Sequence, residues 1–397
     1  MLRKLIWTLF FACVCSVANS QKLLTRKEAS TLASNNRVNN APEQLEVQRQ
    51  RILLQSAGGL DNPELEYEVD PYDPTVLGVL MPIRLPGVYS SRKQVQRQRI
   101  RLSELLLRLN TVEINRLVQN TYSEVQYQQA RVDLLRQQDS LYQAIKNAAQ
   151  RNFQAGQINK LEELFAVNEA NNVRNELERS EFELQGQKNA LSFITNLQEN
   201  FVVEQLKPFP FDSTGNVLVD SIPASLQLQV YEQQVSISRG DLKNERAEQL
   251  PQITAGPLFG LQPPHGEGNK RVGFRVGLSI PLWLGQNRAK INSAQLAVQQ
   301  AEAERDRERQ RLNREYQLAL FNFKREQKSL MYFSTVALEQ ADQIIQTASR
   351  LFAAGETSYI ELLRNIISAF ENKMTYLETV RNYNQAVIEL TYLTANN

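Results

Sequence analysis

Histidine and cysteine, which often carry out catalysis or bind metals, are scarce in this 397-residue sequence, with one histidine and two cysteines. His265 is the only histidine and lies in a stretch rich in glycine and proline, so no Ser-His-Asp triad and no histidine-based zinc or copper site is expected. Gly266 and Gly268 are not followed by a helix start, which argues against a phosphate-binding loop. We therefore expect no catalytic, cofactor-binding or metal-binding residue, and we expect that the protein is not an enzyme.

Both cysteines, Cys13 and Cys15, fall in an N-terminal segment typical of a secretory signal peptide. Two basic residues precede an apolar run at 5–17, and small residues follow at 18–20. Residues 1–20 are therefore the predicted signal peptide, and a lipoprotein lipidated at one of the cysteines is the alternative. Cleavage after residue 20 would leave a mature chain without cysteine, which excludes disulfides and thiolate sites.

The mature chain is electrically balanced. Removing residues 1–20 leaves 45 − 2 = 43 basic residues against 43 acidic ones, which gives no case for nucleic-acid binding. No later segment reaches about 18 consecutive apolar residues, so no transmembrane helix is expected. If the chain crosses a membrane, it must do so with strands in a closed barrel.

The sequence contains two copies of one pattern. Pro82 and Pro281 are 281 − 82 = 199 residues apart, and the motif Arg-x-Phe-x-Ala-Gly recurs at the same offset, at 151–156 and 350–355. Such a duplication predicts two structural repeats. We expect the first repeat at 21–200, a linker at 201–222 and the second repeat at 223–397.

Each copy has the pattern of a helix, two strands, a long helix, a short break and a final helix. The first helix opens at Thr25-x-x-Glu28, a capping-box signature, and ends near Gly58-Gly59, with Pro42 expected to break or kink it. Its counterpart is expected at 223–250.

The long helices are expected at 88–152 and 286–351, and neither contains proline or glycine. At 1.5 Å per residue, roughly 65 residues span about 100 Å, which points to a coiled-coil or tubular assembly. Apolar residues that recur every seventh position are expected to form the buried seam of the second long helix. They are Tyr316, Phe323, Leu330, Ala337, Ile344 and Leu351.

Short segments with period-two alternation separate the helices. They predict strands at 64–70, 75–81, 252–262 and 271–280. Alternation of this kind suits a membrane barrel, but it also suits the half-buried strands of a soluble sheet. Export and the long helices favour the membrane. Four strands cannot close a barrel, whereas three protomers would supply twelve.

The sequence resembles the TolC family of outer-membrane efflux proteins over residues 24–394. The resemblance lies in Asn62-Pro63-Glu64-Leu65, in Pro281-Leu282-Trp283 and in the segment 352–363, Phe-Ala-Ala-Gly-Glu-Thr-Ser-Tyr-Ile-Glu-Leu-Leu. It implies a mainly α fold with a small transmembrane β part. The expected assembly is a homotrimer with a 12-stranded barrel in the outer membrane and a long periplasmic α-helical barrel, and residues 201–222 would lie at its equator.

The resemblance also implies sites. Two helix–turn–helix tips would dock on a periplasmic adaptor, and polar bonds near the tips would close the periplasmic end. The candidate docking residues are Ala155, Gly156, Gln157, Ala354, Gly355 and Glu356. The candidate gate residues are Arg151, Lys160, Glu162, Arg350, Glu361 and Arg364. Glu64, Glu66 and Glu68 could ring the lumen and favour cations, or form a solvated polar face without selectivity.

The function that follows is the exit duct of a tripartite efflux system. The duct would conduct substrates passively from an adaptor and an inner-membrane pump to the exterior, and it would contact outer-membrane lipid. The tip and strand-entry motifs look most like the branch that serves heavy-metal or cation pumps. The alternatives are a duct for protein export (type I secretion) and, from another class, a non-conducting periplasmic coiled-coil scaffold.

Overall fold

A computed structural model describes most of the chain after the predicted signal peptide. It covers residues 22–69, 75–198, 200–211, 225–260, 272–282 and 284–394. The predicted signal peptide with both cysteines, the segment around His265 and the linker part 212–222 lie outside the described residues.

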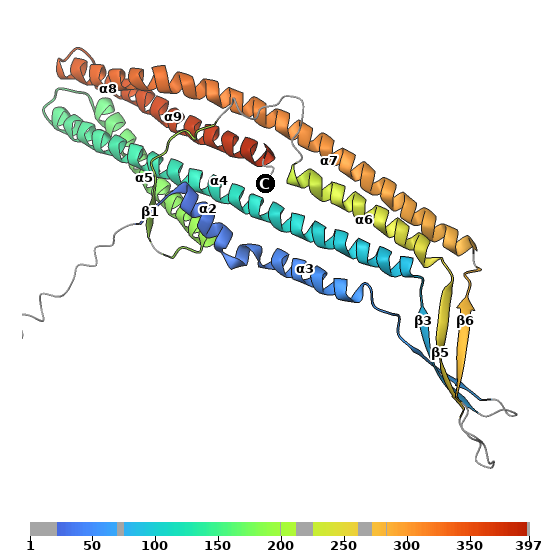
Figure 1. Ribbon diagram of the computed structural model, residues 1–397. Helices are drawn as coiled ribbons and strands as arrows, with labels where there is room; N and C mark the ends of the chain where they lie inside the picture. Colours follow the sequence, from blue (N-terminus) through green and yellow to red (C-terminus); the bar gives the residue numbers. More distant parts are fainter. Residues whose placement is uncertain are drawn as a thin grey trace, which may run out of the picture. The chain divides into compact units, whose positions relative to one another are not determined.

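The chain divides into two compact units, and each unit takes segments from both repeats. Unit 1 comprises residues 1–39, 113–217 and 318–392; unit 2 comprises residues 40–112, 218–317 and 393–397. Most of the described chain is helical (Figure 1). The helices are α2 (Arg26–Asn35), α3 (Arg37–Ser56), α4 (Pro86–Gln154), α5 (Lys160–Thr195), α6 (Leu226–Glu248), α7 (Leu284–Tyr332), α8 (Leu338–Ala353) and α9 (Tyr359–Thr394).

The predicted long helices are present. α4 contains 69 residues, or about 100 Å at the standard rise. The duplication is also visible in the element bounds. α5 and α9 each contain 36 residues, and they begin 199 positions apart at Lys160 and Tyr359. The capping box at the first helix is confirmed, since the backbone N–H of Glu28 donates to Thr25 Oγ1 at 3.2 Å and that of Thr25 donates to Glu28 Oε2 at 2.9 Å.

The expectation that Pro42 breaks the first helix is wrong. Pro42 lies inside α3, and the break falls six residues earlier at Asn36, whose backbone is extended (φ −68°, ψ 110°). The Asn36 side-chain amide donates to the carbonyl of Ile194 at 3.1 Å, at the end of α5. A tertiary hydrogen bond therefore sets the position of the break, which local propensity could not indicate.

The second long helix is not uniformly α-helical. A π-helical turn, η1 (Phe333–Ala337), separates α7 from α8. Beyond it the buried positions of α8 are Ala341 and Ala348, while Leu351 of the predicted seam is 39% exposed. The wider π turn rotates the following helix relative to a strict heptad, so the predicted seam does not continue through Leu351.

The start of the described chain is tied to the segment between the repeats. In unit 1, β1 (Lys22–Leu24) pairs in parallel with β4 (Phe201–Val203). The buried Tyr122 hydroxyl donates to the Leu24 carbonyl at 2.8 Å, and Gln126 Nε2 donates to the Glu204 carbonyl at 3.0 Å. The first residues of the predicted linker are therefore packed against α4.

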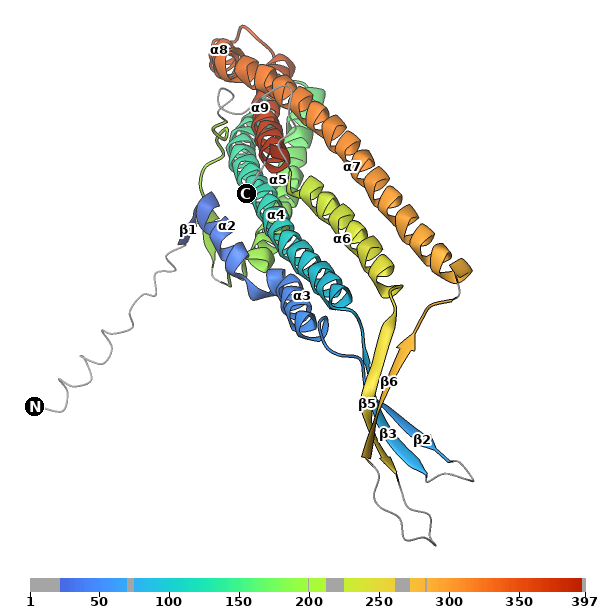
Figure 2. The same cartoon turned by 45° about the vertical axis from the view of Figure 1, so that its right-hand side comes forward.

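The remaining strands form one antiparallel sheet in unit 2, in the order β2-β3-β5-β6. They are β2 (Glu64–Glu68), β3 (Val76–Ile83), β5 (Gln252–Gly260) and β6 (Val272–Ser279), within two residues of the predicted bounds. Figure 2 shows the four strands gathered together beyond the ends of the unit 2 helices. The edges of this sheet are β2 and β6.

The register gives the sheet one apolar face and one polar face. Tyr67 pairs with Leu77, Leu77 with Phe259, and Phe259 with Val272, so that apolar side chains run across all four strands on one face. The same face carries Leu65, Val79, Met81, Ile83, Ile253, Ala255, Pro257, Phe274, Val276 and Leu278. Glu66, Gly78, Leu258 and Gly273 lie on the opposite face, as expected for period-two alternation.

The backbones of β3 and β5 lie very close together at Gly256, which allows their pairing to be tested. A Cβ atom on Gly256 would lie 1.9 Å from the carbonyl oxygen of Val79, whereas one on Gly273 would make an ordinary 3.8 Å contact with Leu258 Cβ. We expect Gly256→Ala to separate β3 from β5 and to destabilise the folded protein by about 1–3 kcal/mol. Gly273→Ala, on the same face, should be nearly neutral. Thermal unfolding of the purified protein measures both, and equal melting temperatures would contradict the pairing.

Candidate functional site

The polar face of the sheet holds three predicted site residues. Glu66 and Glu68 form ion pairs with Arg275 of β6, at 2.5 Å between Glu66 Oε2 and Nη1 and 2.9 Å between Glu68 Oε2 and Nη2. Glu64 lies on the same face and is exposed. The alternation in the sequence places the glutamates together but does not indicate Arg275 as their partner. The available signal was the arginine at an odd, polar position of the second hairpin.

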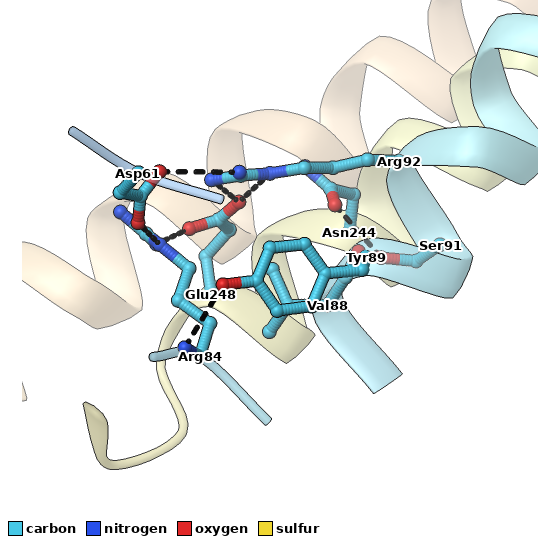
Figure 3. Close-up of polar contacts among 8 residues, drawn as sticks. All are labelled: Asp61, Arg84, Val88, Tyr89, Ser91, Arg92, Asn244 and Glu248. Atoms are coloured by element: carbon cyan, nitrogen blue, oxygen red, sulfur yellow. Dashed lines mark hydrogen bonds and ion pairs between the residues drawn. The ribbon is translucent and has the colours of Figure 1, made fainter. Parts of the chain in front are cut away.

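A second cluster, also missed, joins the helices of unit 2 to the sheet (Figure 3). Asp61 lies just before β2, Arg84 just after β3, Arg92 in α4, and Glu248 at the end of α6. Arg84 Nε donates to Asp61 Oδ2 at 2.7 Å, and the Arg84 guanidinium also pairs with Glu248. Arg92 Nη2 lies 2.7 Å from Glu248 Oε1, and its Nη1 lies 3.6 Å from Asp61 Oδ1.

The Asp61–Arg84–Arg92–Glu248 cluster connects the ends of helices to the ends of strands. Two carboxylates and two guanidinium groups alternate, so each charge has two partners of opposite sign, and all four side chains are between 21% and 29% exposed. The Tyr89 hydroxyl accepts from the backbone N–H of Arg84 at 3.2 Å. Three of the four helix–strand junctions therefore meet at one polar network.

The cluster sets the protonation of Asp61. The hydrogen bond from Arg84 holds the pKa of the Asp61 carboxyl below its ordinary value, partial burial opposes this, and the charges of Arg84 and Arg92 add to the lowering. A carboxyl whose folded pKa is lowered stabilises the protein above its ordinary pKa of about 3.9, and this stabilisation is lost as the pH falls through the lowered value.

The Asp61 carboxylate should therefore contribute to acid stability. We expect the melting temperature of the wild-type protein to fall as the pH drops below about 4, and Asp61→Asn to reduce this dependence and to cost about 1 kcal/mol at neutral pH, since the group is partly solvated. Glu245→Gln, on α6 outside the cluster, is the matched control. Equal acid sensitivity of wild type and Asp61→Asn would refute the role of the cluster.

The two predicted tip turns have the same backbone structure. Gly156 and Gly355 adopt positive φ, 71° and 76°, as a tight turn after a helix requires. In the first turn Gly156 N–H donates to Phe153 O at 2.9 Å and Gln157 N–H donates to Asn152 O at 2.8 Å. The equivalent bonds of the second turn measure 3.0 and 2.9 Å. Both turns are thus Schellman motifs, repeated at the 199-residue offset.

Two candidate gate residues have a local structural role. Glu162 Oε2 accepts from the backbone N–H of Asn159 at 3.1 Å, and Glu361 Oε2 accepts from that of Ser358 at 3.2 Å. The return bonds, at 3.0 and 3.3 Å, complete a capping box at the start of α5 and the same reciprocal pair at the start of α9.

The other four gate candidates take no part in these capping bonds. Lys160 pairs with Glu163, and its Nζ lies 4.7 Å from the centre of the Phe153 ring. Arg151, Arg350 and Arg364 are exposed. The two turns are joined by a contact that the sequence pattern does not indicate, in which Asn152 Nδ2 donates to the Tyr359 hydroxyl at 2.9 Å.

The role of the turn glycine can be tested by replacing glycine with alanine at two positions, where opposite effects on stability are expected. Space is open around Gly156 and around Gly186, but only Gly156 has positive φ. We expect Gly156→Ala to destabilise unit 1 by about 1–2 kcal/mol because an L-residue is strained in the left-handed region. Gly186→Ala, in an exposed part of α5, should stabilise by up to about 1 kcal/mol. Thermal unfolding distinguishes these signs, and a neutral Gly156→Ala would contradict the turn geometry.

None of the helices in the described part of the chain combines the length and the apolar character needed to cross a membrane. Within the same residues, no group of three or more His, Cys, Asp or Glu side chains is placed to hold a metal ion.

Comparison with known proteins agrees with the predicted resemblance. Residues 218–396 match the family described as outer membrane efflux protein. The chain is 24% identical over 382 residues to the cobalt-zinc-cadmium resistance protein CzcC of Cupriavidus metallidurans, covering 91% of this chain and 88% of CzcC.

Solved structures share the fold. The Campylobacter jejuni CmeC outer membrane channel superposes with a TM-score of 0.80 at 13% identity, covering 93% of this chain and 85% of CmeC. CusC superposes with a TM-score of 0.79 at 17% identity, covering 98% of this chain and 96% of CusC. The predicted mainly α fold with a small β part is confirmed.

Proposed function

We propose that this chain, a member of the TolC family of outer membrane efflux proteins, forms the exit duct of a tripartite efflux system and conducts its substrates passively. The observation that carries the proposal is the one-sided sheet. Leu65, Val272 and Phe274 of its apolar face are 77%, 73% and 68% exposed in the described chain. A contiguous apolar face of this extent is costly in water and is suited to lipid.

The sheet also has two unpaired edges, β2 and β6. Three copies of the chain would supply 3 × 4 = 12 strands, and β6 of each copy would pair with β2 of the next. Closure would satisfy the edge N–H and C=O groups, present the apolar face to outer-membrane lipid and turn the polar face inward. This arrangement accounts for both the face and the edges, which a periplasmic coiled-coil scaffold leaves unexplained.

The helical turns would be the contact with the periplasmic adaptor of an inner-membrane pump. Support comes from their duplicated geometry, in which Gly156 and Gly355 expose two equivalent turns linked by Asn152 and Tyr359. Because Glu162 and Glu361 cap helices, closure of the periplasmic end would fall to the gate candidates that cap no helix. These are Arg151, Arg350 and Arg364, together with Lys160.

Metal cations are the substrates that we propose. The full-length similarity to a cobalt-zinc-cadmium resistance protein and the acidic polar face support this choice over exported proteins. Cations would be cargo in transit, and the pump would select among them.

Conductance of the purified protein tests the duct. We expect detergent extraction from outer-membrane fractions, a trimer mass, and discrete single-channel steps when that preparation is added to a planar lipid bilayer. A water-soluble monomer or dimer that is folded, helical and non-conducting would reject the duct and favour the scaffold.

A further inference from the structure

All charged side chains of the described sheet lie on one face. Among the residues of β2, β3, β5 and β6, the charged ones are Glu64, Glu66, Glu68 and Arg275. The register places all four opposite the apolar face. Arg275 is therefore the one cation on the polar face within these strands as the structure describes them.

Arg275 reaches its partners across the whole sheet. It lies on edge strand β6, whereas Glu66 and Glu68 lie on the other edge strand, β2. The residue opposite Arg275 in β5 is Gly256, and the residue opposite Glu66 in β3 is Gly78. Gly256 has no side chain, so the Arg275 guanidinium group meets none from the residue opposite it in β5.

The space above Gly78 is occupied by a neighbouring side chain. A Cβ atom there would lie 2.8 Å from Leu258 Cδ2, which is too close, and 3.5 Å from both Cβ and Oε2 of Glu66, which is ordinary contact. Leu258 therefore packs over Gly78 beside the carboxylate that receives Arg275. The two ion pairs form one arrangement, in which a single arginine binds two carboxylates of the polar face.

We propose that Arg275 is a specificity-determining residue that limits the cation selectivity of the pore. This inference rests on the duct function proposed above, in which the polar face lines the lumen. The three glutamates alone would give each protomer a charge of −3, and Arg275 changes it to −3 + 1 = −2. In three copies the ring changes from −9 to −6, and rings of charged side chains set the ion preference of a pore.

The pair is also accessible to passing ions. Arg275 and Glu66 side chains are 36% and 37% exposed, and that of Glu68 is 56% exposed. Charges at this level of exposure are screened by salt but still act on an ion within a Debye length, about 8–10 Å at physiological ionic strength. The arginine thus offsets part of the acidic charge that acts on an ion passing within this distance.

The test is the reversal potential of single channels in a potassium chloride gradient, recorded with the full-length trimer. We expect Arg275→Gln to raise the permeability ratio of potassium to chloride about twofold or more, because the ring becomes more acidic. Arg275→Lys keeps the charge and should retain the wild-type ratio. This conservative variant separates charge from packing.

If Arg275→Gln does not assemble, a second variant with the opposite expected effect on the permeability ratio tests the proposal. The double variant Glu66→Gln with Glu68→Gln leaves Arg275 without its carboxylates and should lower the ratio below that of wild type. A conducting wild type with the same ratio in every assembled variant would overturn the role of Arg275 alone. A wild-type trimer without discrete steps would overturn the duct function, and the inference about Arg275 with it.

Discussion

The four-stranded sheet has an exposed apolar face and two free edges. The described part of this chain alone neither buries that face nor pairs the backbone groups of those edges. The outer edges of β2 and β6 have no strand partner among the described residues, and apolar side chains such as Leu65 and Phe274 face solvent. Unpaired edges and apolar surface both favour association, with further copies for the edges and with lipid for the face. This constraint gives a physical reason for the proposed trimeric, membrane-embedded duct, and several features of unit 2 hold the sheet in place.

The Asp61–Arg84–Arg92–Glu248 cluster is the clearest of these features. The chain passes from α3 into β2, from β3 into α4 and from α6 into β5. Three junctions between a helix and a strand therefore lie at this cluster. Helix ends and strand ends leave polar groups to be satisfied. Each charged group of the cluster has two partners of opposite charge, so the network can hold these junctions in place. A single sheet provides no large apolar core that would do so.

Duplication explains why the same local devices occur twice. The turns at Gly156 and Gly355 share a Schellman motif, and each is followed by a carboxylate that bonds back to the N-cap. Local motifs of this kind depend on a few neighbouring residues, so they survive in both copies. The π turn at Phe333–Ala337 occurs in the second long helix, while α4 runs as one α-helix. The two repeats therefore differ in the geometry of their long helices.

The sequence alone determined the features with short-range causes. Alternation of apolar and polar residues gave the strands and their two faces, the absence of proline and glycine gave the long helices, and the capping box and turn glycines gave helix ends. Tertiary structure decided what depends on residues far apart in the chain. Asn36 ends a helix through Ile194, which is 158 residues away, and Arg275 meets Glu68 across 207 residues. Residue spacing along the chain does not predict such contacts, because they form only when the tertiary structure brings the side chains together.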